Sequence, residues 1–393
     1  MKILFISHSS PLKEGGAETR TREVAFRLSQ LGHKVTILCG KTDVGDPDVT
    51  EVNGVKIISK KTLPNVLLKR YPYPHYFSLA AANFFLMLYI PSFLRGQQFD
   101  LIREDCAPFP PTFLLSLARL PTAKRIAVTH MLSRTLTGWI KYYGPVFGSV
   151  GFVMDRLLRS GKLKYDRIIC AAKWFADEMK QSPAIANKVC YVPNGVDLEE
   201  FSPALIRRDN NGQIRLLSVG RLAETKGHRY VIEALSLLKP DYPSIRLDIL
   251  GNGPLKERLK ELTRQLAVAD MVQFCPPVAH SQMPKLYHNY DFLVMPSIWE
   301  GLPVSLIEAM ASKLPIIAAD IPAIKDVLDA DSAAFSSKEN ARDLADTLKW
   351  AFENADEARA HAESAYEIVK RYNWTATAMQ EIDEFDDREA SKL

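Results

Sequence analysis

Ile214-Arg-Leu-Leu-Ser-Val-Gly-Arg-Leu-Ala-Glu-Thr-Lys-Gly227 is the stretch of this chain that decides its fold class. Its first six residues are mostly aliphatic or β-branched, as in a short buried strand. Gly220 ends that run, a loop carrying Arg221 and Lys226 follows, and a helical pattern occupies residues 228–238. A strand, a loop and a helix in this order predict one unit of a parallel, helix-covered sheet.

The same alternation of strands and helices runs through the whole chain. Strand patterns of the first half lie at residues 3–7, 34–39, 55–59, 99–104, 125–129, 167–170 and 189–192. Those of the second half lie at residues 214–219, 246–250, 272–274, 292–295 and 316–318. Helical patterns such as 17–31 and 173–180 stand between several of them. The sequence therefore predicts an α/β fold with two Rossmann-like, doubly wound parallel-sheet domains.

Chain length and one polar stretch set the expected domain boundaries. At 393 residues the chain is too long for one ordinary domain and suits two. Residues 194–212 carry Asn, Gly, Pro and charged residues, and we interpret them as the linker. We expect a first domain at residues 1–197 and a second at residues 198–372, with final helical patterns at 341–372 and 375–385.

Two cations in the loop after the 214–219 strand are candidates for binding a diphosphate. Arg221 offers a bidentate guanidinium fork, and Lys226, five residues later, offers a mobile point charge. Basic residues beside a glycine in such loops are also common as a solvated surface. In open parallel sheets, however, ligands bind at the carboxyl ends of strands, where this loop lies.

A second motif, Met295-Pro-Ser-Ile-Trp-Glu-Gly-Leu-Pro-Val-Ser-Leu-Ile-Glu-Ala-Met310, places two carboxylates around the start of a helix. Pro303 suits the first helical turn, because its missing N–H costs nothing there. The backbone N–H groups of residues 304–306 would then form an anion pocket. Glu300 precedes this pocket and Glu308 lies about one turn into the helix, where both can accept hydrogen bonds from hydroxyl groups. The motif fits a nucleotide-sugar, or else an ordinary helix start with two surface glutamates.

Composition indicates a soluble globular protein, with 47% hydrophobic and 24% charged residues. The apolar run at residues 3–6 is short, so we expect a first strand there and no signal peptide. Five cysteines, at positions 39, 106, 170, 190 and 275, lack paired spacing, which favours reduced thiols in a cytoplasmic protein. No zinc-site pattern occurs, and we expect neither a metal nor another cofactor.

Charge is unevenly divided between the two halves. Residues 1–200 hold 27 Lys and Arg against 17 Asp and Glu, whereas the remaining residues hold 23 against 29. The basic first half favours an acidic partner, such as an anionic membrane surface or a phosphorylated acceptor. No recognised nucleic-acid-binding module occurs, so we do not expect nucleic acid as a partner.

Two stretches of the first half suggest contact with lipid. Residues 60–98 carry five basic residues and no acidic one, and they include the largely apolar run 76–94. Asn83 and Pro91 interrupt that run, which favours a buried helix, with basic and aromatic residues at a lipid interface, over a membrane-spanning one. Residues 139–164 mix aromatic and basic side chains, and they fit either an acceptor-side surface or a solvated basic helix.

The two motifs together resemble those of one enzyme family. Gly-Arg-Leu-x-x-x-Lys-Gly at 220–227, paired with Glu-x7-Glu at 300–308, is similar to the retaining glycosyltransferases of family 4, which have the GT-B fold. Further matching segments, in order, are Gly15-Gly-Ala-Glu18, Val192-Pro-Asn-Gly-Val-Asp197, Leu250-Gly-Asn-Gly-Pro254 and Tyr372-Asn-Trp374. The resemblance, over residues 2–385, implies two domains facing across a cleft. It also implies a last helix, within 373–393, that crosses back onto the first domain.

The resemblance implies roles for the motif residues. Arg221 and Lys226 would stabilise the leaving diphosphate, Glu300 would hold hydroxyl groups of the donor sugar, and Glu308 those of the ribose. His130, at a strand end, would contact the donor sugar or the acceptor, and with Arg221, Lys226 and Glu300 it completes the catalytic set. The expected donor-binding residues are Gly15, Gly16, Gly220, Arg221, Lys226, Val278, Ser297, Glu300, Gly301, Leu302, Pro303, Val304 and Glu308.

Other interpretations stay open at several positions. Gly15 and Gly16 also suit a plain tight loop, Ser297 a turn, and His130 a structural role. Cys275-Pro-Pro-Val278 departs from the family pattern, since prolines remove backbone donors, and it leaves the choice between UDP and GDP open. Arg103-Glu-Asp105 replaces a turn that is often His-rich in relatives, and Asp105 is the acceptor candidate there.

The sequence predicts a metal-independent glycosyltransferase, retaining by its resemblance to family 4, that acts in the cytoplasm or at the cytoplasmic face of the membrane. It would transfer sugar from a UDP- or GDP-sugar to a lipid-linked or cell-surface polysaccharide acceptor. A glycosidase has little use for the diphosphate clamp, which disfavours that reading of the two glutamates. A transferase with a soluble acceptor and a non-catalytic nucleotide-sugar-binding protein stay open as alternatives, as does the choice between front-face and covalent routes.

Overall fold

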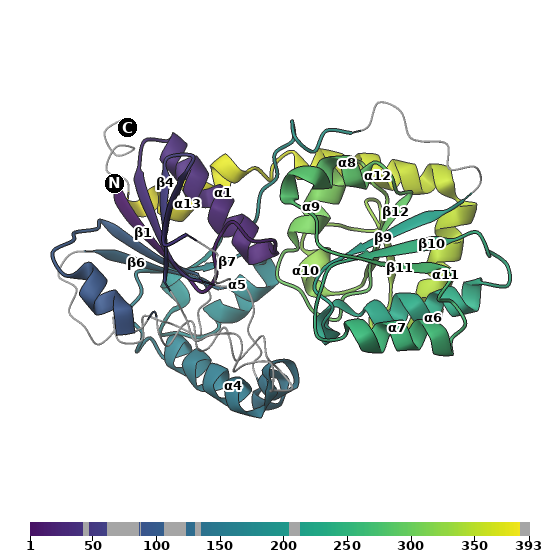
Figure 1. Cartoon of the computed structure of the whole chain (residues 1–393), viewed down its shortest axis with the longest axis horizontal. Coiled ribbons are helices and arrows are strands. Elements are labelled where there is room, and N and C mark those ends of the chain that lie inside the picture. The colour runs from purple at the N-terminus through teal and green to yellow at the C-terminus, as the bar shows by residue number, and fades with distance from the viewer. Residues whose placement is uncertain are drawn as a thin grey trace. The chain divides into compact units, whose positions relative to one another are not determined.

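The computed structural model describes residues 1–41, 47–60, 86, 88–105, 123–129, 135–203 and 213–385. Within it the chain divides into two compact units (Figure 1). The first unit comprises Met1–Pro193 and Trp374–Leu393, and the second comprises Asn194–Asn373. The boundaries thus fall within a few residues of those expected at 197 and 372. The predicted α/β class with two parallel sheets is confirmed.

The first unit is built on an eight-stranded sheet with the order β3-β4-β2-β1-β5-β6-β7-β8. Every neighbouring pair is parallel except β3 with β4. Strand order reverses at β1, which lies between β2 and β5. The strands are β1 (Lys2–Ser7), β2 (Lys34–Gly40), β3 (Val49–Val52), β4 (Val55–Lys60), β5 (Leu101–Asp105), β6 (Lys124–Thr129), β7 (Arg167–Cys170) and β8 (Val189–Tyr191).

Amphipathic helices cover this sheet, and its central strands are almost wholly buried. The helices are α1 (Gly16–Gln30), α4 (Leu136–Arg159), α5 (Lys173–Lys180) and α13 (Trp374–Ile382). Residues 88–94 are also helical, and Ile90 and Phe93 pack with Leu4 and Ile6 of β1. This part of the 76–94 run is therefore a core helix; residues 76–85 and 87 lie outside the described residues. Among the described helices, none combines the length and the apolar character needed to cross a bilayer.

The returning helix α13 is anchored to α1 and β5 by buried charges. Glu381 accepts hydrogen bonds from Arg20 Nη2 at 2.7 Å and from Arg103 Nε at 2.5 Å. Burial alone would raise the pKa of the Glu381 carboxyl, but Arg103 and Arg20 outweigh it, so the pKa lies below its ordinary value. Arg167 adds hydrogen bonds to the carbonyl oxygens of Gln380 and Glu381. The C-terminal helix is thereby a structural part of the first unit.

Asp105 belongs to the same buried network. Its carboxylate accepts from Arg103 Nη1 and from Thr21 Oγ1, both at 2.6 Å, and the residue is 2% exposed. Burial raises the pKa of this carboxyl, although Arg103 opposes the shift. A carboxylate enclosed in this way has no free surface for an acceptor substrate. The structure thus corrects the prediction that Asp105 recognises the acceptor.

The second unit is built on a six-stranded, wholly parallel sheet with the order β11-β10-β9-β12-β13-β14. Strand order reverses at β9, which lies between β10 and β12. The strands are β9 (Arg215–Val219), β10 (Arg246–Leu250), β11 (Val272–Cys275), β12 (Phe292–Met295), β13 (Ile316–Ala319) and β14 (Ala334–Ser336). The point of reversal is where a doubly wound sheet leaves a crevice for a ligand.

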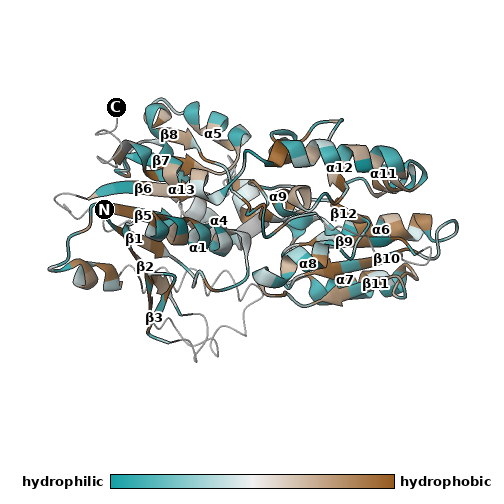
Figure 2. Ribbon diagram, turned by 90° about the horizontal axis from the view of Figure 1, so that it is seen from above, coloured by the Kyte–Doolittle hydropathy of each residue, from teal (hydrophilic) through white to brown (hydrophobic). Residues whose placement is uncertain are grey.

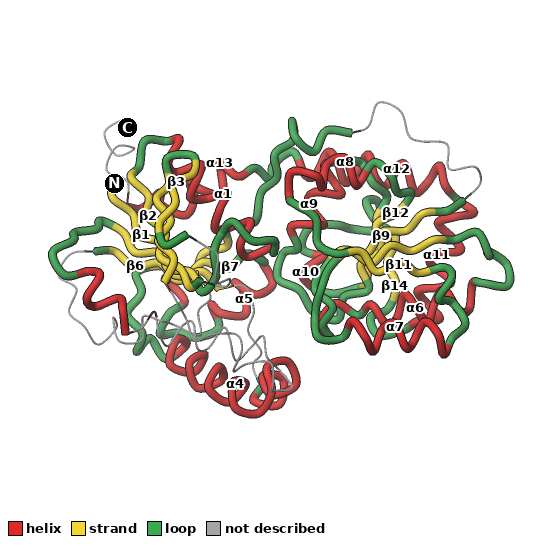
Figure 3. The backbone as a smooth tube through the Cα atoms, viewed as in Figure 1, coloured by secondary structure: helices red, strands yellow, loops and turns green. Residues whose placement is uncertain are grey.

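Helices cover both faces of this sheet, with α6 and α7 on one side and α8, α9 and α12 on the other (Figure 3). The ribbon of α12 is largely hydrophilic (Figure 2), whereas almost every residue of α9 is buried. The helices are α6 (His228–Leu238), α7 (Lys256–Gln265), α8 (Met283–Tyr287), α9 (Val304–Ala311), α10 (Pro322–Lys325), α11 (Ala341–Glu353) and α12 (Ala355–Val369). The single helical pattern predicted at 341–372 is in fact two helices, which separate at Asn354.

Candidate functional site

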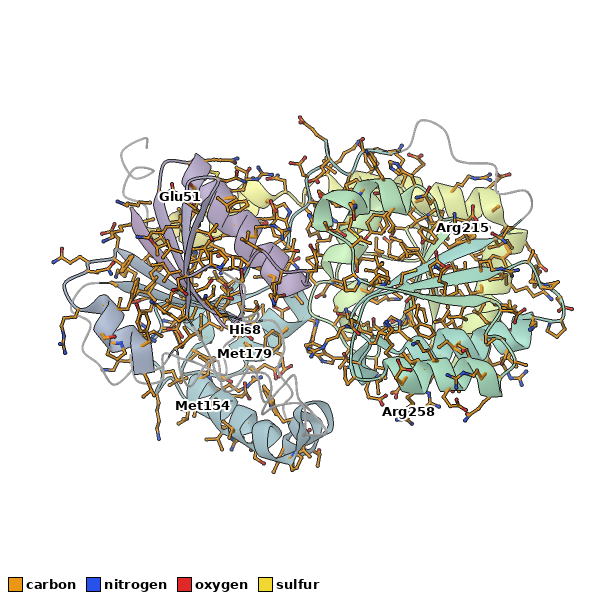
Figure 4. The ribbon with its side chains drawn as sticks, viewed as in Figure 1. His8, Glu51, Met154, Met179, Arg215 and Arg258 are labelled. Atoms are coloured by element: carbon orange, nitrogen blue, oxygen red, sulfur yellow. The ribbon has the colours of Figure 1, made fainter. Side chains whose placement is uncertain are left out.

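Two loops at the switch point of the second sheet carry most of the predicted site residues. One follows β9 and holds Arg221 and Lys226; the other follows β12 and holds Ser297 and Glu300. Because β9 and β12 are hydrogen-bonded neighbours, both loops leave the same edge of the sheet. Arg215 begins β9 and therefore lies at the other end of that strand (Figure 4).

The cationic loop is shaped by Gly220 and by a short 3-10 turn. Gly220 has φ 151°, a conformation that other residues rarely adopt. A Cβ atom there would lie 3.1 Å from Cε of Lys226, so glycine also makes room for the lysine stem. The turn at Glu224–Lys226 then points the chain into α6. Arg221 lies directly after Gly220 and is half-buried.

His228, the first residue of α6, packs directly after this loop. It is buried, and its Nδ1 lies 3.2 Å from Ser218 Oγ on β9. Burial, and secondarily the charge of Lys226, lowers the pKa of His228 to about 4. The imidazole is therefore neutral at physiological pH.

Lys226, Glu300 and Ser297 meet at one carboxylate oxygen. Lys226 Nζ donates to Glu300 Oε1 at 2.6 Å, and Ser297 Oγ donates to the same oxygen at 2.8 Å. The lysine side chain is 21% exposed and that of Glu300 is 9% exposed. The sequence predicted that these residues share a site, and the structure places the cation and the carboxylate in direct contact. The three form a compact polar cluster that stays open to solvent on one side.

Backbone hydrogen bonds hold the two loops together. The amides of Ile298 and Trp299 both donate to the carbonyl oxygen of Thr225, at 2.8 and 3.3 Å. The cluster is therefore fixed by main-chain bonds as well as by side chains. A preorganised arrangement of this kind suits a site that stabilises charge, because little reorganisation is needed when a ligand arrives.

The glutamate loop ends at the N-terminus of α9. Pro303 is the residue directly before α9, with φ −66° and ψ 128°, whereas the sequence predicted that it lies in the first helical turn. Val304 and Ser305 are the first two residues of α9, where an α-helix has no acceptor of its own for the amides. The Leu306 amide donates to Pro303 O at 3.2 Å, so it does not join the predicted anion pocket.

Gly301 and Leu302 connect the cluster to α9. Leu302 is buried, and its carbonyl oxygen accepts from Asn194 Nδ2 at 2.6 Å. Its side chain therefore packs inside the unit, which leaves only its backbone available to a ligand. Val278 lies half-buried in the loop after β11, and His130 lies outside the described residues. The roles of Val278 and His130 in ligand binding remain predictions.

Glu308 lies in the second turn of α9 and has two partners that the sequence did not predict. Its Oε1 is 2.7 Å from His280 Nε2, and its Oε2 accepts from the Tyr287 hydroxyl at 2.8 Å. His280 comes after the proline-containing loop and Tyr287 ends α8, 28 and 21 residues before Glu308. No local motif links the three residues, so only the fold brings them together.

In the first unit, Gly15 and Gly16 lie at the start of α1, where a phosphate cradle was predicted. Both are exposed, and the Glu18 carboxylate lies close to Gly15: a Cβ there would lie 2.2 Å from Glu18 Oε2. Glu18 Oε1 accepts from Ser9 Oγ at 2.6 Å and lies 3.7 Å from Nε2 of His8, beyond the end of β1 (Figure 4). A carboxylate thus lies beside the predicted cradle, where its negative charge disfavours a phosphate.

In the described part of the chain, no group of three or more His, Cys, Asp or Glu residues is arranged to hold a metal ion. Separately, Lys226 and Arg221, with the N-terminus of α9, supply positive charge in the site of the second unit. This combination favours an anionic ligand. Glu300 and Glu308 add acceptors for hydroxyl groups, so the site suits a molecule that carries both phosphate and sugar.

Comparison with known proteins places both units in one family. Residues 14–200 match the model described as Glycosyltransferase Family 4, and residues 206–368 match the model described as Glycosyl transferases group 1. The D-inositol 3-phosphate glycosyltransferase of Corynebacterium urealyticum is 25% identical over 98% of this chain and 95% of its own length. The Escherichia coli protein WcaL, named as a glycosyltransferase of colanic acid biosynthesis, is 30% identical over 49% of this chain and 48% of its own length.

Solved structures share the fold at low sequence identity. Sucrose-phosphate synthase from Thermosynechococcus elongatus has a TM-score of 0.82 at 18% identity, with both chains covered completely. The Anabaena protein HepE, crystallised with UDP-glucose, has a TM-score of 0.72 at 16% identity, again over both whole chains. These likenesses confirm the GT-B fold. With both units matched by the models of one enzyme family, the chain belongs to the group 1, family 4-like glycosyltransferases.

Proposed function

We propose that this glycosyltransferase takes sugar from a UDP- or GDP-sugar and transfers it with retention of configuration, without a metal ion. The contact of Lys226 and Ser297 with Glu300, beside the start of α9, carries this proposal. In this proposal Lys226 and Arg221 bind the diphosphate, and Glu300 accepts hydrogen bonds from sugar hydroxyl groups. The charge that a metal would supply comes from these side chains and from the helix N-terminus.

In the proposed reaction, the bond between the anomeric carbon and the phosphate oxygen breaks and a glycosidic bond to the acceptor oxygen forms. The electron pair of the broken bond leaves with the diphosphate. The proton of the acceptor hydroxyl also goes to the leaving diphosphate in the front-face route. Lys226 stabilises the negative charge that develops on the diphosphate, and it does so most strongly in the transition state.

We propose a lipid-linked or surface-polysaccharide acceptor and a location on the cytoplasmic face of a membrane. The basic first half, and the exposed Leu136, Val150 and Val153 of α4 with Arg156 at the end of that helix, support this choice. The naming of WcaL for colanic acid biosynthesis agrees with it. The full-length likeness to a D-inositol 3-phosphate glycosyltransferase favours the alternative of a soluble acceptor.

Donor use is tested by incubating the protein with UDP- and GDP-sugars and measuring release of the nucleotide diphosphate. We expect turnover with one of the donors. In Glu300→Gln the rate of that turnover should fall about 10²-fold or more. Glu261→Gln, on the exposed part of α7, is the matched control. Equal activity in Glu300→Gln and the wild type would remove Glu300 from the site. Nucleotide binding without transfer or hydrolysis would favour the non-catalytic alternative.

Acceptor class is tested by sedimentation with vesicles of anionic and of neutral lipid. We expect the protein to sediment with anionic vesicles at low salt and to be released at high salt. A protein that stays in the supernatant with both kinds of vesicle would favour the soluble-acceptor alternative.

A further inference from the structure

Glu308 is a buried carboxylate whose two oxygens are each held by one donor. The residue is 4% exposed, His280 Nε2 lies 2.7 Å from Oε1, and Tyr287 donates to Oε2 at 2.8 Å. A carboxylate only accepts hydrogen bonds, so Nε2 is the nitrogen of His280 that carries the hydrogen. The carboxylate plane is therefore fixed from two directions.

The two donors are themselves held by a common aromatic neighbour. The ring of Phe201, which is 1% exposed, lies 5.6 Å from the His280 ring and 6.2 Å from the Tyr287 ring, centroid to centroid. Burial, and then the neighbouring Glu308, raises the pKa of the Tyr287 hydroxyl well above its ordinary value, so it stays a donor. Tyr287 is 1% exposed, whereas the His280 side chain is 17% exposed. His280 is thus the member of the pair that a ligand can reach.

The hydrogen-bonding capacity of Glu308 is only half used by these two donors. An ionised carboxylate has about four acceptor positions, two on each oxygen. One position on each oxygen remains, on the side away from its fixed donor. Two neighbouring hydroxyl groups of one ligand would fill both positions, and a vicinal diol provides them.

We propose that His280 is a positioning residue for nucleotide recognition, which with Tyr287 orients Glu308 to accept hydrogen bonds from both ribose hydroxyls of the donor. This inference rests on the proposed function, because it assigns the diol to a nucleotide. His280 does not take part in bond breaking. Its loss should weaken binding of the ribose and leave the chemical step intact.

The test compares nucleotides with and without ribose hydroxyls. UDP, GDP and their 2′-deoxy and 3′-deoxy forms are titrated calorimetrically into the wild type, His280→Leu and His280→Gln. In the wild type we expect each missing hydroxyl to weaken binding about 10-fold, as for a hydrogen bond to a charged group. In His280→Leu the ribonucleotide should bind about 10-fold more weakly, with the deoxy forms changed less than about 2-fold. His280→Gln, whose amide can donate, should restore part of the discrimination.

His288→Leu is the matched control, because this neighbouring histidine contacts Ser202 O at 2.9 Å and not Glu308. In turnover, His280→Leu should raise KM for the donor about 10-fold with kcat unchanged within about 2-fold. Equal weakening of the ribo and deoxy forms in His280→Leu would overturn the inference, and so would unchanged discrimination. If His280→Leu does not fold, His280→Gln and Tyr287→Phe provide the same comparison. A wild type that binds no nucleotide would overturn the proposed function itself.

Discussion

Each unit holds a cation and a carboxylate in direct contact, and the two contacts differ in what surrounds them. In the first unit, the side chains of Arg103 and Glu381 are 1% and 0% exposed, and further charges and Thr21 complete their network. In the second unit, the side chains of Lys226 and Glu300 are 21% and 9% exposed at the switch point of the sheet. The first contact is closed, and the second is open to a ligand.

This difference predicts a structural role for the first pair and a functional role for the second. A buried pair can hold two elements in place, but removing one partner leaves an uncompensated charge in the core. A partly exposed pair adds less to stability, and its partners can be shared with an incoming anion or hydroxyl group. Mutation of the two pairs should therefore have different effects. In the first unit it should destabilise the fold, and in the second it should reduce activity.

The largest effect is expected at the closed contact. Glu381→Gln removes the negative charge that Arg20 and Arg103 share, and we expect a loss of about 3–5 kcal/mol in the free energy of unfolding. Hydrogen exchange of β1 and β5 should report it, because both strands lie beside the network. Glu51→Gln is the control, since Glu51 is exposed on the edge strand β3 (Figure 4). If β5 were equally protected from hydrogen exchange in Glu381→Gln and in Glu51→Gln, the buried network would not be what anchors α13.

The open contact should show the opposite pattern. Lys226→Ala leaves Ser297 as a donor to Glu300, so we expect a small change in stability but a loss of about 10²–10³-fold in kcat/KM. Lys226→Arg keeps the charge and should retain part of the activity. Lys285→Ala, exposed on α8, is the control for removal of a lysine. Near-normal turnover by a folded Lys226→Ala protein would take the lysine out of the mechanism.

Mild acid should distinguish the units through His228. Its pKa is about 4 in the fold, against about 6.5 in an unfolded chain, so between these values only the unfolded state gains a proton. Stability of the second unit should therefore fall as pH falls through this window, by about 2 kcal/mol between pH 7 and pH 5. Glu381 has a lowered pKa, so its contribution is lost only at lower pH.

Hydrogen exchange of α6 against pH measures this effect, and His228→Gln should flatten the profile over the same window. The β1 and β5 strands of the first unit serve as the internal reference. A profile for α6 that does not change in His228→Gln would assign the acid sensitivity to other groups.

Local signals in the sequence were sufficient for most of the fold. The helix at His228–Leu238 has the predicted bounds because its apolar spacing begins directly after Gly227. The strand Val49–Val52 was missed, although Asn53 and Gly54 carry the signal of a two-residue hairpin turn, with φ 49° and 74°. This strand has few apolar side chains, so its sequence lacks the hydrophobic pattern used to predict strands. The break at Asn354 was missed because the helical pattern continues on both sides of it.

The site could be predicted only where its residues share a motif. Two short segments, each directly after one of two neighbouring strands, contain Lys226, Ser297 and Glu300. Their contact therefore follows from the sheet topology. His280 lies in the turn before α8 and Tyr287 ends α8, and the tertiary fold brings both to Glu308, which no sequence spacing encodes. Asp105 was misassigned for the same reason, because its partner Arg103 is fixed by Glu381, 278 residues later. A sequence shows that a charge exists, but it does not show what encloses the charge.

The smallest effect is expected at a third tertiary pair, which is exposed. Lys239 Nζ lies 2.8 Å from Asp270 Oδ1, with side chains 35% and 63% exposed. Because water screens this pair, Asp270→Asn should cost less than about 0.5 kcal/mol, and 1 M salt should abolish even that difference. Urea denaturation at low and high salt measures it. The Glu381 network is shielded from ions, so its contribution to the free energy of unfolding should change little at high salt. If Asp270→Asn proved as costly as Glu381→Gln, burial would not be what distinguishes the closed contact from the others.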